Sequence, residues 1–581
     1  MNEINEIQQG INLFKLGLKF ELNKEYKTSL QHYLLSAELL LKAKKSRKFS
    51  NDLAFINKYY NSVLLKAKHL NNFLFLLNHS SKVNGNYYHL WSYDSSFKDL
   101  KPYDLPSLSL SQLNSSAEYN RLNSFDIYTS NNGNNMDYEI IQDVITDCSI
   151  VTSLSVCNHY NLKYDSNLAI NSIHPQNDQK LPIKSSDGIY NIKLYFNGSP
   201  RLVKVNDELP LDINGNLITA KTSSNFDIWP ALIEKAIMSI WRTYEFNGSN
   251  SATDLQMITN WIPDHISFSD RKFKQERAWD TLFKGFKSGI CLLTLGSKSI
   301  KNDMNPQLLF QGFVENHAYA IKDISIDSNN RRYLTISNLW KHSKTYNFDW
   351  DYVCDNFDAI YASWDPEIFT FHDQVHFAFK GSKSSDDSNP LERCPRFNLN
   401  VDVPSTVNDI QSGDVWILLN RHLKDKNLIN KCYSALHVSK SDYLENNTII
   451  NEDDEHINSL NILVKDNVTP SNNKFNITIS QLIHDNQSII QSSIDDVYYT
   501  LTAFASHPLK LINANKSFLF SQKVCIIYII VYSYAYIYYR LQVVGHCDQL
   551  VVTVAYHLMA LIHITIYVLN LQTKKFNYDL L

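Results

Sequence analysis

Apolar side chains recur at helical intervals over the first 77 residues. The first run places them at Ile4, Ile7, Ile11, Phe14 and Leu18. The spacing of three and four residues returns over 30–41 and, after a polar break, over 53–67. This is the 3.6-residue period of a helix that buries one face. We therefore predict three antiparallel helices, and we assign residues 1–77 to a small α-helical bundle.

Residues 136–370 mix the helical period with the two-residue alternation of strands. Helices are predicted over 147–160 and 229–244, and strands over 189–211, 317–326 and 331–340. The 189–211 stretch alternates around Asn197-Gly198, a dipeptide that favours a tight hairpin turn. We predict an α+β domain here, with subdomains at about 136–222 and 223–370. Residues 78–135 are rich in Ser, Asn and Tyr, which is typical of a linker or irregular lead-in.

Short alternating runs separated by Asn, Ser and Asp follow over residues 371–512. The runs lie at 415–423, 435–440, 461–466, 475–480 and 498–505. This spacing predicts an antiparallel β-sandwich.

The last segment, residues 513–581, is an atypical hydrophobic tail. Its stretch 524–539 is shorter than the ~20 residues that a membrane helix needs, and 550–570 just reaches that length. Three interpretations compete: a membrane hairpin, a buried β-rich end of the sandwich, or sequence that is not a native exon product. We favour the third, a gene-model artefact, because the strand pattern stops abruptly after 505–512 and Lys523-Val524-Cys525 is what a retained intron would encode.

Composition narrows the class of protein. The 581 residues are 44% apolar and 12% aromatic, which predicts a mostly globular chain, and the net charge of -4 gives no basic excess for nucleic acid. The eight cysteines include no CxxC pair, so neither a zinc site nor a dense disulfide framework is expected. The first residues lack the basic start and apolar core of a signal peptide. A reduced, cytoplasmic compartment fits these observations.

One cysteine, one histidine and one asparagine have the local setting of a thiol catalyst. Cys148 opens a predicted helix, where the helix dipole lowers a thiol pKa. His317 begins a strand and Asn338 ends the next, so antiparallel pairing brings them together. Gln142 would donate to an oxyanion beside the Cys148 backbone N–H, and Trp340 would cover the Asn–His bond. Each residue alone is weak evidence, since a single cysteine more often serves packing, and spacing does not decide between these roles.

Several segments along the chain resemble a known family, and this resemblance decides between the roles of these residues. QDVITDCSIVTSLSV, NGSPRLVKVNDELPLD, DIWPALIEKAIM, NHAYAIKD and TISNLW resemble the calpain family of cysteine proteases, in the family's order, and in particular its PalB-type and MIT-domain branch. The resemblance implies a papain-like protease core in which Cys148, His317 and Asn338 form the triad and Gln142 contributes to the oxyanion hole. It also implies a calpain C2-like β-sandwich after the core.

The chain departs from the family in three respects. Asn338-Leu339-Trp340 replaces the usual Asn-Pro-Trp, so local order around the triad asparagine is in question. Ser149 replaces the aromatic residue of conventional calpains, which fits the divergent branch. No EF-hand loop occurs, and the acidic run 451–455 lacks the required spacing and Gly. Calcium dependence is therefore not carried over, and we expect no metal or other cofactor.

The same branch suggests a biological setting. An N-terminal MIT-type helical domain implies docking onto ESCRT-III subunits at endosomes, through a peptide laid in a groove between helices. Fungal members activate a zinc-finger transcription factor by limited C-terminal cleavage in the alkaline-pH response. We therefore expect a cytoplasmic endopeptidase recruited to endosomes or plasma-membrane signalling sites, with peripheral contact to the endosomal membrane.

Two other functions remain open from the residues. A calpain-like scaffold without activity would serve as an adaptor that binds endosomal partners. A transglutaminase-type acyltransferase also uses Cys and His, but its third residue is ordinarily Asp rather than the Asn338 found here. The sequence does not give the cleavage motif, the calcium requirement or the oligomeric state.

Overall fold

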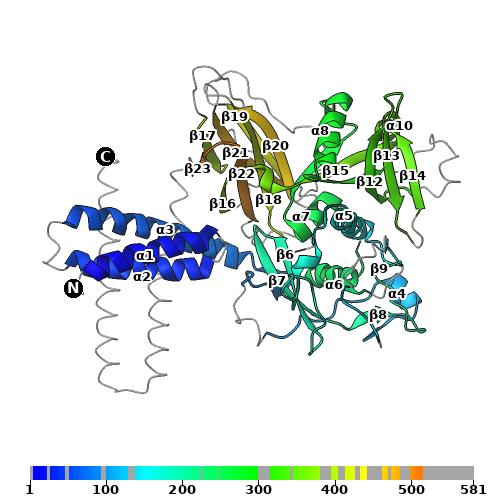
Figure 1. The fold of residues 1–581 in the computed structure, drawn as a ribbon, viewed down its shortest axis with the longest axis horizontal. Coiled ribbons are helices and arrows are strands. Elements are labelled where there is room, and N and C mark those ends of the chain that lie inside the picture. The colour runs from blue at the N-terminus through cyan, green and yellow to red at the C-terminus, as the bar shows by residue number, and fades with distance from the viewer. Residues whose placement is uncertain are drawn as a thin grey trace. The chain divides into compact units, whose positions relative to one another are not determined.

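The fold is described from a computed structural model. It describes residues 4–22, 26–45, 52–92, 100–122, 124–128, 138–223, 227–246, 248–298, 314–340, 344–379, 394–403, 413–425, 432–440, 461–468, 473–483 and 497–514. Helices and strands are mixed along this part of the chain (Figure 1).

Three helices form the N-terminal part: α1 (Ile4–Leu22), α2 (Tyr26–Lys45) and α3 (Leu53–His79). Their apolar faces meet in one buried cluster that includes Tyr33, Leu40 and Val63. Gly17 permits the close approach of α1 and α2, because a Cβ there would lie 2.5 Å from the Tyr33 ring. The N-terminal helical region predicted from the apolar period is therefore present (Figure 1).

Short elements follow where the sequence predicted a linker. They are β1 (Lys82–Val83), β2 (Asn86–Tyr87), α4 (Leu110–Asn114) and β3 (Glu118–Asn120), and β4 (Ile140–Ile141) comes just after that stretch. β3 pairs with β8 (Leu209–Leu211), and β4 pairs with β9 (Lys221–Thr222). The buried Tyr88 hydroxyl donates to Ser239 O at 2.8 Å. The described part of this stretch therefore packs on the domain that follows it.

The first half of that domain surrounds a largely buried helix. Its elements are α5 (Cys148–Tyr164), the strands β5 (Ile173–His174), β6 (Ile189–Phe196) and β7 (Ser199–Asn206), α6 (Trp229–Trp241) and α7 (Ser251–Thr259). The predicted hairpin is β6–β7, and its turn residues Asn197 and Gly198 both have positive φ. The three helices and the hairpin contribute to one hydrophobic core, which fixes the start of α5.

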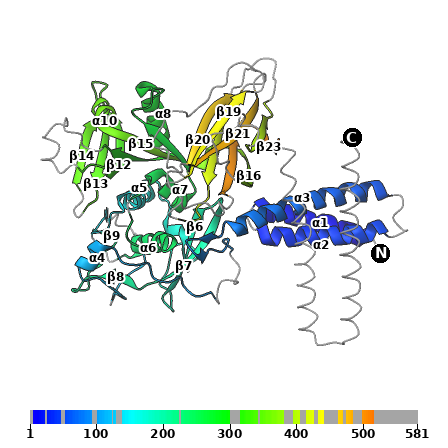
Figure 2. The ribbon, with the colours of Figure 1, turned by 180° about the vertical axis from the view of Figure 1, so that it is seen from behind.

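The second half is a six-stranded antiparallel sheet in the order β10-β15-β11-β12-β13-β14. The strands are β10 (Ile262–Ser267), β11 (Cys291–Ser297), β12 (Ala318–Ile326), β13 (Arg332–Asn338), β14 (Lys344–Asp349) and β15 (Phe357–Trp364). Helices α8 (Gln275–Lys287) and α10 (Trp350–Asn356) contribute buried residues to its core. α5 lies beside β12, as both views show (Figures 1 and 2), and Thr152 Oγ1 donates to Ala318 O at 3.2 Å.

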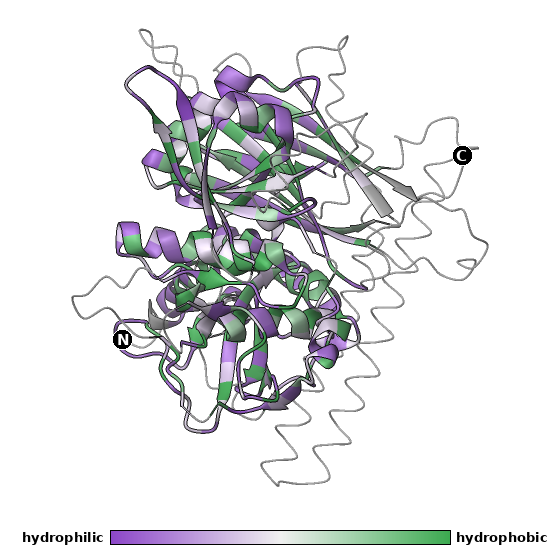
Figure 3. Ribbon diagram, turned by 90° about the vertical axis from the view of Figure 1, so that its right-hand side faces the viewer, coloured by the Kyte–Doolittle hydropathy of each residue, from purple (hydrophilic) through white to green (hydrophobic). Residues whose placement is uncertain are grey.

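Two four-stranded antiparallel sheets follow, in the orders β16-β22-β18-β20 and β19-β21-β17-β23. Their strands are β16 (Phe371–Phe379), β17 (Arg396–Val401), β18 (Gly413–Arg421), β19 (Cys432–Lys440), β20 (Asn461–Val468), β21 (Lys474–Ile483), β22 (Val497–Ala505) and β23 (Leu509–Asn513). Figure 3 shows hydrophobic and hydrophilic residues interleaved along the chain, and along β17 exposed and buried residues alternate at every position. Both sheets contribute side chains, such as Ile417 and Leu399, to a single buried cluster.

The hydrophobic tail from residue 515 onward, and with it our three interpretations of residues 513–581, lies outside the described residues. Among the helices that the structure describes, none is long and apolar enough to cross a membrane.

Candidate active site

Cys148 is the first residue of α5, as the sequence predicted, and its side chain is only partly covered. Asp147 is the N-cap residue, but its buried side chain makes no capping hydrogen bond. The rest of the first turn is buried, including Ser149 and Ile150. The fold therefore presents one thiol at a fixed helix start.

His317 lies directly before β12, and its backbone is held from β11. The His317 N–H donates to Ser297 Oγ at 2.9 Å, and the Ser297 N–H donates to His317 O at 3.0 Å. The imidazole packs edge-on against the Tyr319 ring, with centroids 5.0 Å apart. These contacts fix the position of His317, and a side-chain partner fixes the orientation of its imidazole ring.

That partner is Asn338, at the end of β13. Its Oδ1 lies 3.1 Å from His317 Nε2 and also accepts the Trp340 N–H at 3.0 Å. An atom that accepts from a backbone N–H is the amide oxygen, so His317 Nε2 must carry the hydrogen that it shares with Oδ1. Nδ1 then keeps its lone pair and is the nitrogen able to accept a proton. The Trp340 ring lies 5.9 Å from the imidazole, and its side chain stays 37% exposed.

The thiol and the imidazole are neighbours without being bonded. Cys148 interacts with the backbone N–H of Ala318, the residue after His317. Within the part of the chain that the structure describes, no hydrogen bond joins the Cys148 thiol to the His317 ring. Burial, opposed by the Asn338 bond, lowers the pKa of His317 to about 4, so the ring is a neutral base at pH 7.

The sequence predicted that the helix start would lower the Cys148 pKa, and this expectation is wrong for the arrangement described. Burial raises the pKa of the Cys148 thiol to about 11, and the carboxyls of Asp147 and Asp254 raise it further. Desolvation and two nearby acids therefore outweigh the helix dipole. A thiolate–imidazolium pair requires a closer approach of Sγ to His317 Nδ1.

Gln142 is buried beside the segment that follows the triad asparagine. Its backbone N–H donates to Leu339 O at 2.9 Å, and its side-chain Nε2 donates to Ile145 O at 2.7 Å. The side-chain Oε1 has no hydrogen-bond partner. The structure thus brings Gln142 to the Leu339-Trp340 segment, while one amide hydrogen is used within its own loop. Its role toward an oxyanion stays a prediction.

Sequence reasoning missed three residues that shape this site. Ser297 holds the backbone of His317, and nothing in its local sequence marks it. Asp147 and Glu234 are fully buried acids next to the nucleophile segment. Glu234 had a detectable signal, because it is an acidic residue within the otherwise apolar run WPALIEKAIM. In the described residues, no group of three or more His, Cys, Asp or Glu side chains is placed to hold a metal ion.

Comparisons with known proteins agree on one family. The family model described as calpain family cysteine protease matches residues 110–380. Mouse calpain-7 is 29% identical over 402 residues, which cover 61% of this chain and 48% of that protein. The calpain-like protease palB of Emericella nidulans is 31% identical over 312 residues, or 49% of this chain and 35% of that protein. The calpain-like protease palB/RIM13 of Debaryomyces hansenii is 29% identical over 367 residues, or 59% and 43%.

The chain spans about half the length of calpain-7 and less of the two fungal relatives. The matched residues contain Cys148, His317 and Asn338 together with the two halves of the α+β fold. Residues 110–380 of this chain are similar to a calpain-family cysteine protease domain.

Proposed function

We propose that the chain is a calpain-like cysteine endopeptidase that performs limited proteolysis. The observation that carries the proposal is the His317–Asn338 bond, whose polarity the Trp340 N–H fixes, beside a helix-start cysteine. This arrangement leaves the His317 Nδ1 lone pair available for the Cys148 proton. The thiol–imidazole pair is the minimum that acyl-enzyme chemistry requires.

The mechanism assigns one task to each residue. His317 Nδ1 takes the thiol proton as Cys148 Sγ attacks the scissile carbonyl, and the same proton then goes to the leaving amine. The Cys148 backbone N–H and the Gln142 amide donate to the oxyanion of the tetrahedral intermediate. Water, activated by His317, hydrolyses the thioester and regenerates the thiol. Asn338 keeps the imidazole in the required tautomer throughout, and Trp340 covers the Asn–His bond.

The similarity to palB and palB/RIM13 supports a narrower role. We propose C-terminal processing of a zinc-finger transcription factor in the fungal alkaline-pH response. Helices α1–α3 would act as an MIT-like domain that docks onto ESCRT-III subunits, and residues 371–512 would form the calpain-type β-sandwich. The protein would be cytoplasmic and would be recruited peripherally to endosomes or plasma-membrane signalling sites.

Cys148→Ala tests the proposal directly. The variant should lose cleavage of the transcription factor and lose covalent labelling by an epoxide affinity probe. Cys354→Ala is the matched control, because Cys354 is a partly buried thiol on α10 outside the site, and it should keep both activities. Processing that continues in the Cys148→Ala strain would exclude this cysteine as the nucleophile.

A catalytically inactive adaptor that binds ESCRT-III partners is the second candidate. It is favoured by the raised pKa of Cys148 and by Leu339 in place of proline. The same probe separates the two functions. An adaptor thiol should react no faster than Cys354, whereas an activated Cys148 should react first and selectively.

A further inference from the structure

Two buried carboxyl groups meet next to the nucleophile segment. Asp147 directly precedes Cys148 and is 1% exposed, and Glu234 on α6 is 0% exposed. Their side chains are in hydrogen-bonding contact with each other. An ionised carboxylate can only accept hydrogen bonds, so a bond between two carboxyls requires that one of them carries a proton.

The remaining hydrogen bonds leave this contact without another donor. The Ala220 N–H donates to Glu234 Oε2 at 2.9 Å. Glu234 Oε1 and both side-chain oxygens of Asp147 have no donor among the described residues. Buried acceptors without donors are costly, and a proton held between the two groups satisfies one oxygen of each.

The charged neighbours do not neutralise the pair. Asp143, in the loop before α5, and Asp254, on α7, are acids that face it, and the hydroxyl of the buried Tyr244 also faces it. The Lys221 ammonium on β9 does not neutralise the pair, because it is paired with Asp143. A tyrosine and two acids cannot offset a second negative charge on the pair.

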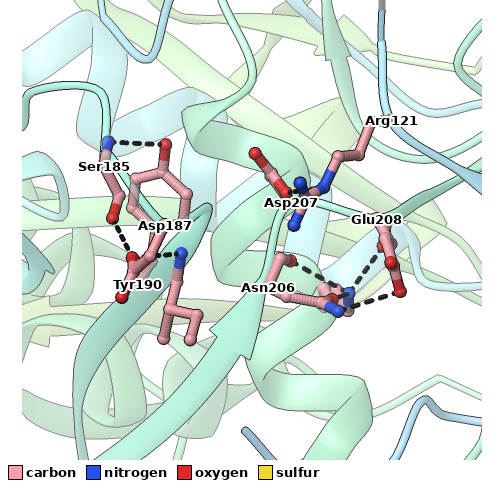
Figure 4. A network of polar contacts seen from close by, with 9 residues as sticks. Arg121, Ser185, Asp187, Tyr190, Asn206, Asp207 and Glu208 are labelled. Atoms are coloured by element: carbon pink, nitrogen blue, oxygen red, sulfur yellow. Dashed lines mark hydrogen bonds and ion pairs between the residues drawn. The ribbon is translucent and has the colours of Figure 1, made fainter. Parts of the chain in front are cut away.

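The one cation next to Glu234 in sequence points elsewhere. Lys235 Nζ donates to Asn206 O at 3.0 Å and to Glu208 O at 2.6 Å. Asn206 and Glu208 belong to a separate polar network, in which Asn206 Nδ2 donates to Glu208 Oε2 at 2.9 Å (Figure 4). Arg121 in the same network pairs with Asp207 (Figure 4). The local cations are thus committed to other acceptors.

We propose that Asp147 and Glu234 share a single proton and that this carboxyl–carboxylate pair is a positioning device for the nucleophile. It ties the loop that carries Gln142 and Cys148 to α6, and it keeps a second negative charge away from the thiol. The proposal rests on the proposed function only where it concerns catalysis.

The electrostatics agree with the geometry. Burial raises the pKa of Asp147 to about 6 and holds the pKa of Glu234 well above its usual range. Loss of the shared proton would leave two adjacent anions at the start of α5, where Asp147 already opposes ionisation of Cys148. The repulsion would separate the loop from α6 and displace the oxyanion donors. Cleavage should therefore decline in alkali as the pair loses its proton.

Two isosteric variants mimic the singly protonated pair at every pH. In Glu234→Gln, the amide oxygen can accept the Ala220 N–H and the amide nitrogen can donate to Asp147. In Asp147→Asn, the new amide donates to Glu234. Both variants should cleave within a few-fold of the parent rate at neutral pH, and their alkaline limit of kcat/KM should move upward by about one pH unit or more.

Three further variants show whether the proton is the cause. Glu234→Leu and Asp147→Ala remove the bond and should lose most activity at all pH values. Asp280→Asn removes the charge of an exposed acid on α8 that takes no part in the pair, so its pH profile should match the parent. An unchanged alkaline limit in both isosteric variants, or activity as low as that of Glu234→Leu, would overturn the proposal.

Thermal stability, which does not depend on catalysis, separates this proposal from the protease assignment. Glu234 has a raised pKa when folded, so the stability that its protonated form lends is lost as pH rises from about 4 toward the folded pKa. The full-length Cys148→Ala variant is compared with the Cys148→Ala, Glu234→Gln double variant. The thermal midpoint of the double variant minus that of the single variant should increase between pH 5 and 8. The same difference for Asp280→Asn should not change with pH.

Failure of the shared-proton proposal can then be distinguished from failure of the protease assignment. If the difference in thermal midpoint does not change with pH for either Glu234→Gln or Asp147→Asn, the shared proton is refuted, whether or not the protein is a protease. A growing difference in a chain whose Cys148→Ala variant still processes substrate would refute the protease assignment and leave the proton pair standing.

Discussion

Because two histidines are buried in the C-terminal sheets, we predict that mild acid destabilises these sheets. His376 on β16 and His422 after β18 both contact the hydroxyl of Thr500 on β22, with each nitrogen 2.7 Å from Oγ1. The other nitrogens, His376 Nε2 and His422 Nδ1, are buried and have no hydrogen-bond partner among the residues that the structure describes. A single hydroxyl therefore joins two neutral rings, since it can donate to one and accept from the other.

The surroundings oppose protonation of either ring. Burial lowers the pKa of His376 to about 3, and the nearby Arg201 and His69 lower it further. Burial, with His376 and Arg201, holds the pKa of His422 well below its usual range. Arg201 is itself fully buried at the β6–β7 hairpin, next to Gly198, whose Cβ would lie 2.4 Å from the His376 ring. These contacts around His376 and His422 therefore favour uncharged imidazoles.

The sign of the pH dependence follows. Both folded pKa values lie below the unfolded value of about 6.5, so the stability is fully present above that pH and falls as acid protonates the unfolded chain. Because the unfolded imidazoles are already half protonated at pH 6.5, the two sites together cost about 3 kcal/mol between pH 6.5 and 5. That is a large part of the roughly 5–15 kcal/mol by which a domain is stable.

Hydrogen exchange of peptides from β16 and β22 measures this loss. After correction for intrinsic exchange, the opening free energy of the parent should fall by about 3 kcal/mol between pH 6.5 and 5. His422→Gln should halve that slope, whereas His32→Gln, in the half-buried setting of α2, should leave it unchanged. An equal slope in the parent and in His422→Gln would refute the reasoning.

Three substitutions give further tests. Asn338→Ala should lower kcat roughly 10- to 100-fold in steady-state cleavage with little change in KM, because it frees the His317 ring. Arg201→Met should destabilise the chain to urea by roughly 3–5 kcal/mol, because it removes six buried hydrogen bonds, three of which join the β6–β7 hairpin to Leu77, Ser80 and Ser81 at the end of α3. Gly285→Ala should lower the thermal midpoint by an equivalent of about 1–3 kcal/mol, because its Cβ would lie 2.4 Å from the Trp364 ring.

Local patterns predicted the elements that local sequence controls. Asn197-Gly198 predicted the β6–β7 turn because both residues tolerate the positive φ that the turn requires. The alternation over 331–340 predicted β13, although the strand ends at Asn338. The end matters, because the chain must leave the sheet there for the Trp340 N–H to reach Asn338 Oδ1.

Elements that depend on distant partners were not predictable. β3, within the stretch predicted as a linker, is a strand only because Tyr119 and its neighbours pair with residues 209–211. Asp147 and Glu234 are 87 positions apart, and no local pattern says that their carboxyls meet. Ser297 gives no signal as the residue that holds His317. Such contacts arise from tertiary packing, which periodicity does not encode.

The Cys148 pKa shows most clearly how burial can reverse a local rule. A helix start stabilises a nearby anion by typically 0.3–1 kcal/mol, which is less than one pKa unit. Burial and the acids Asp147 and Asp254 instead raise the thiol pKa to about 11, from an ordinary value near 9. The helix start is therefore too weak to make the thiolate by itself. In the mechanism that we propose, the remaining source is an imidazolium in contact with Sγ, so the proton would leave Cys148 only as His317 Nδ1 arrives to accept it.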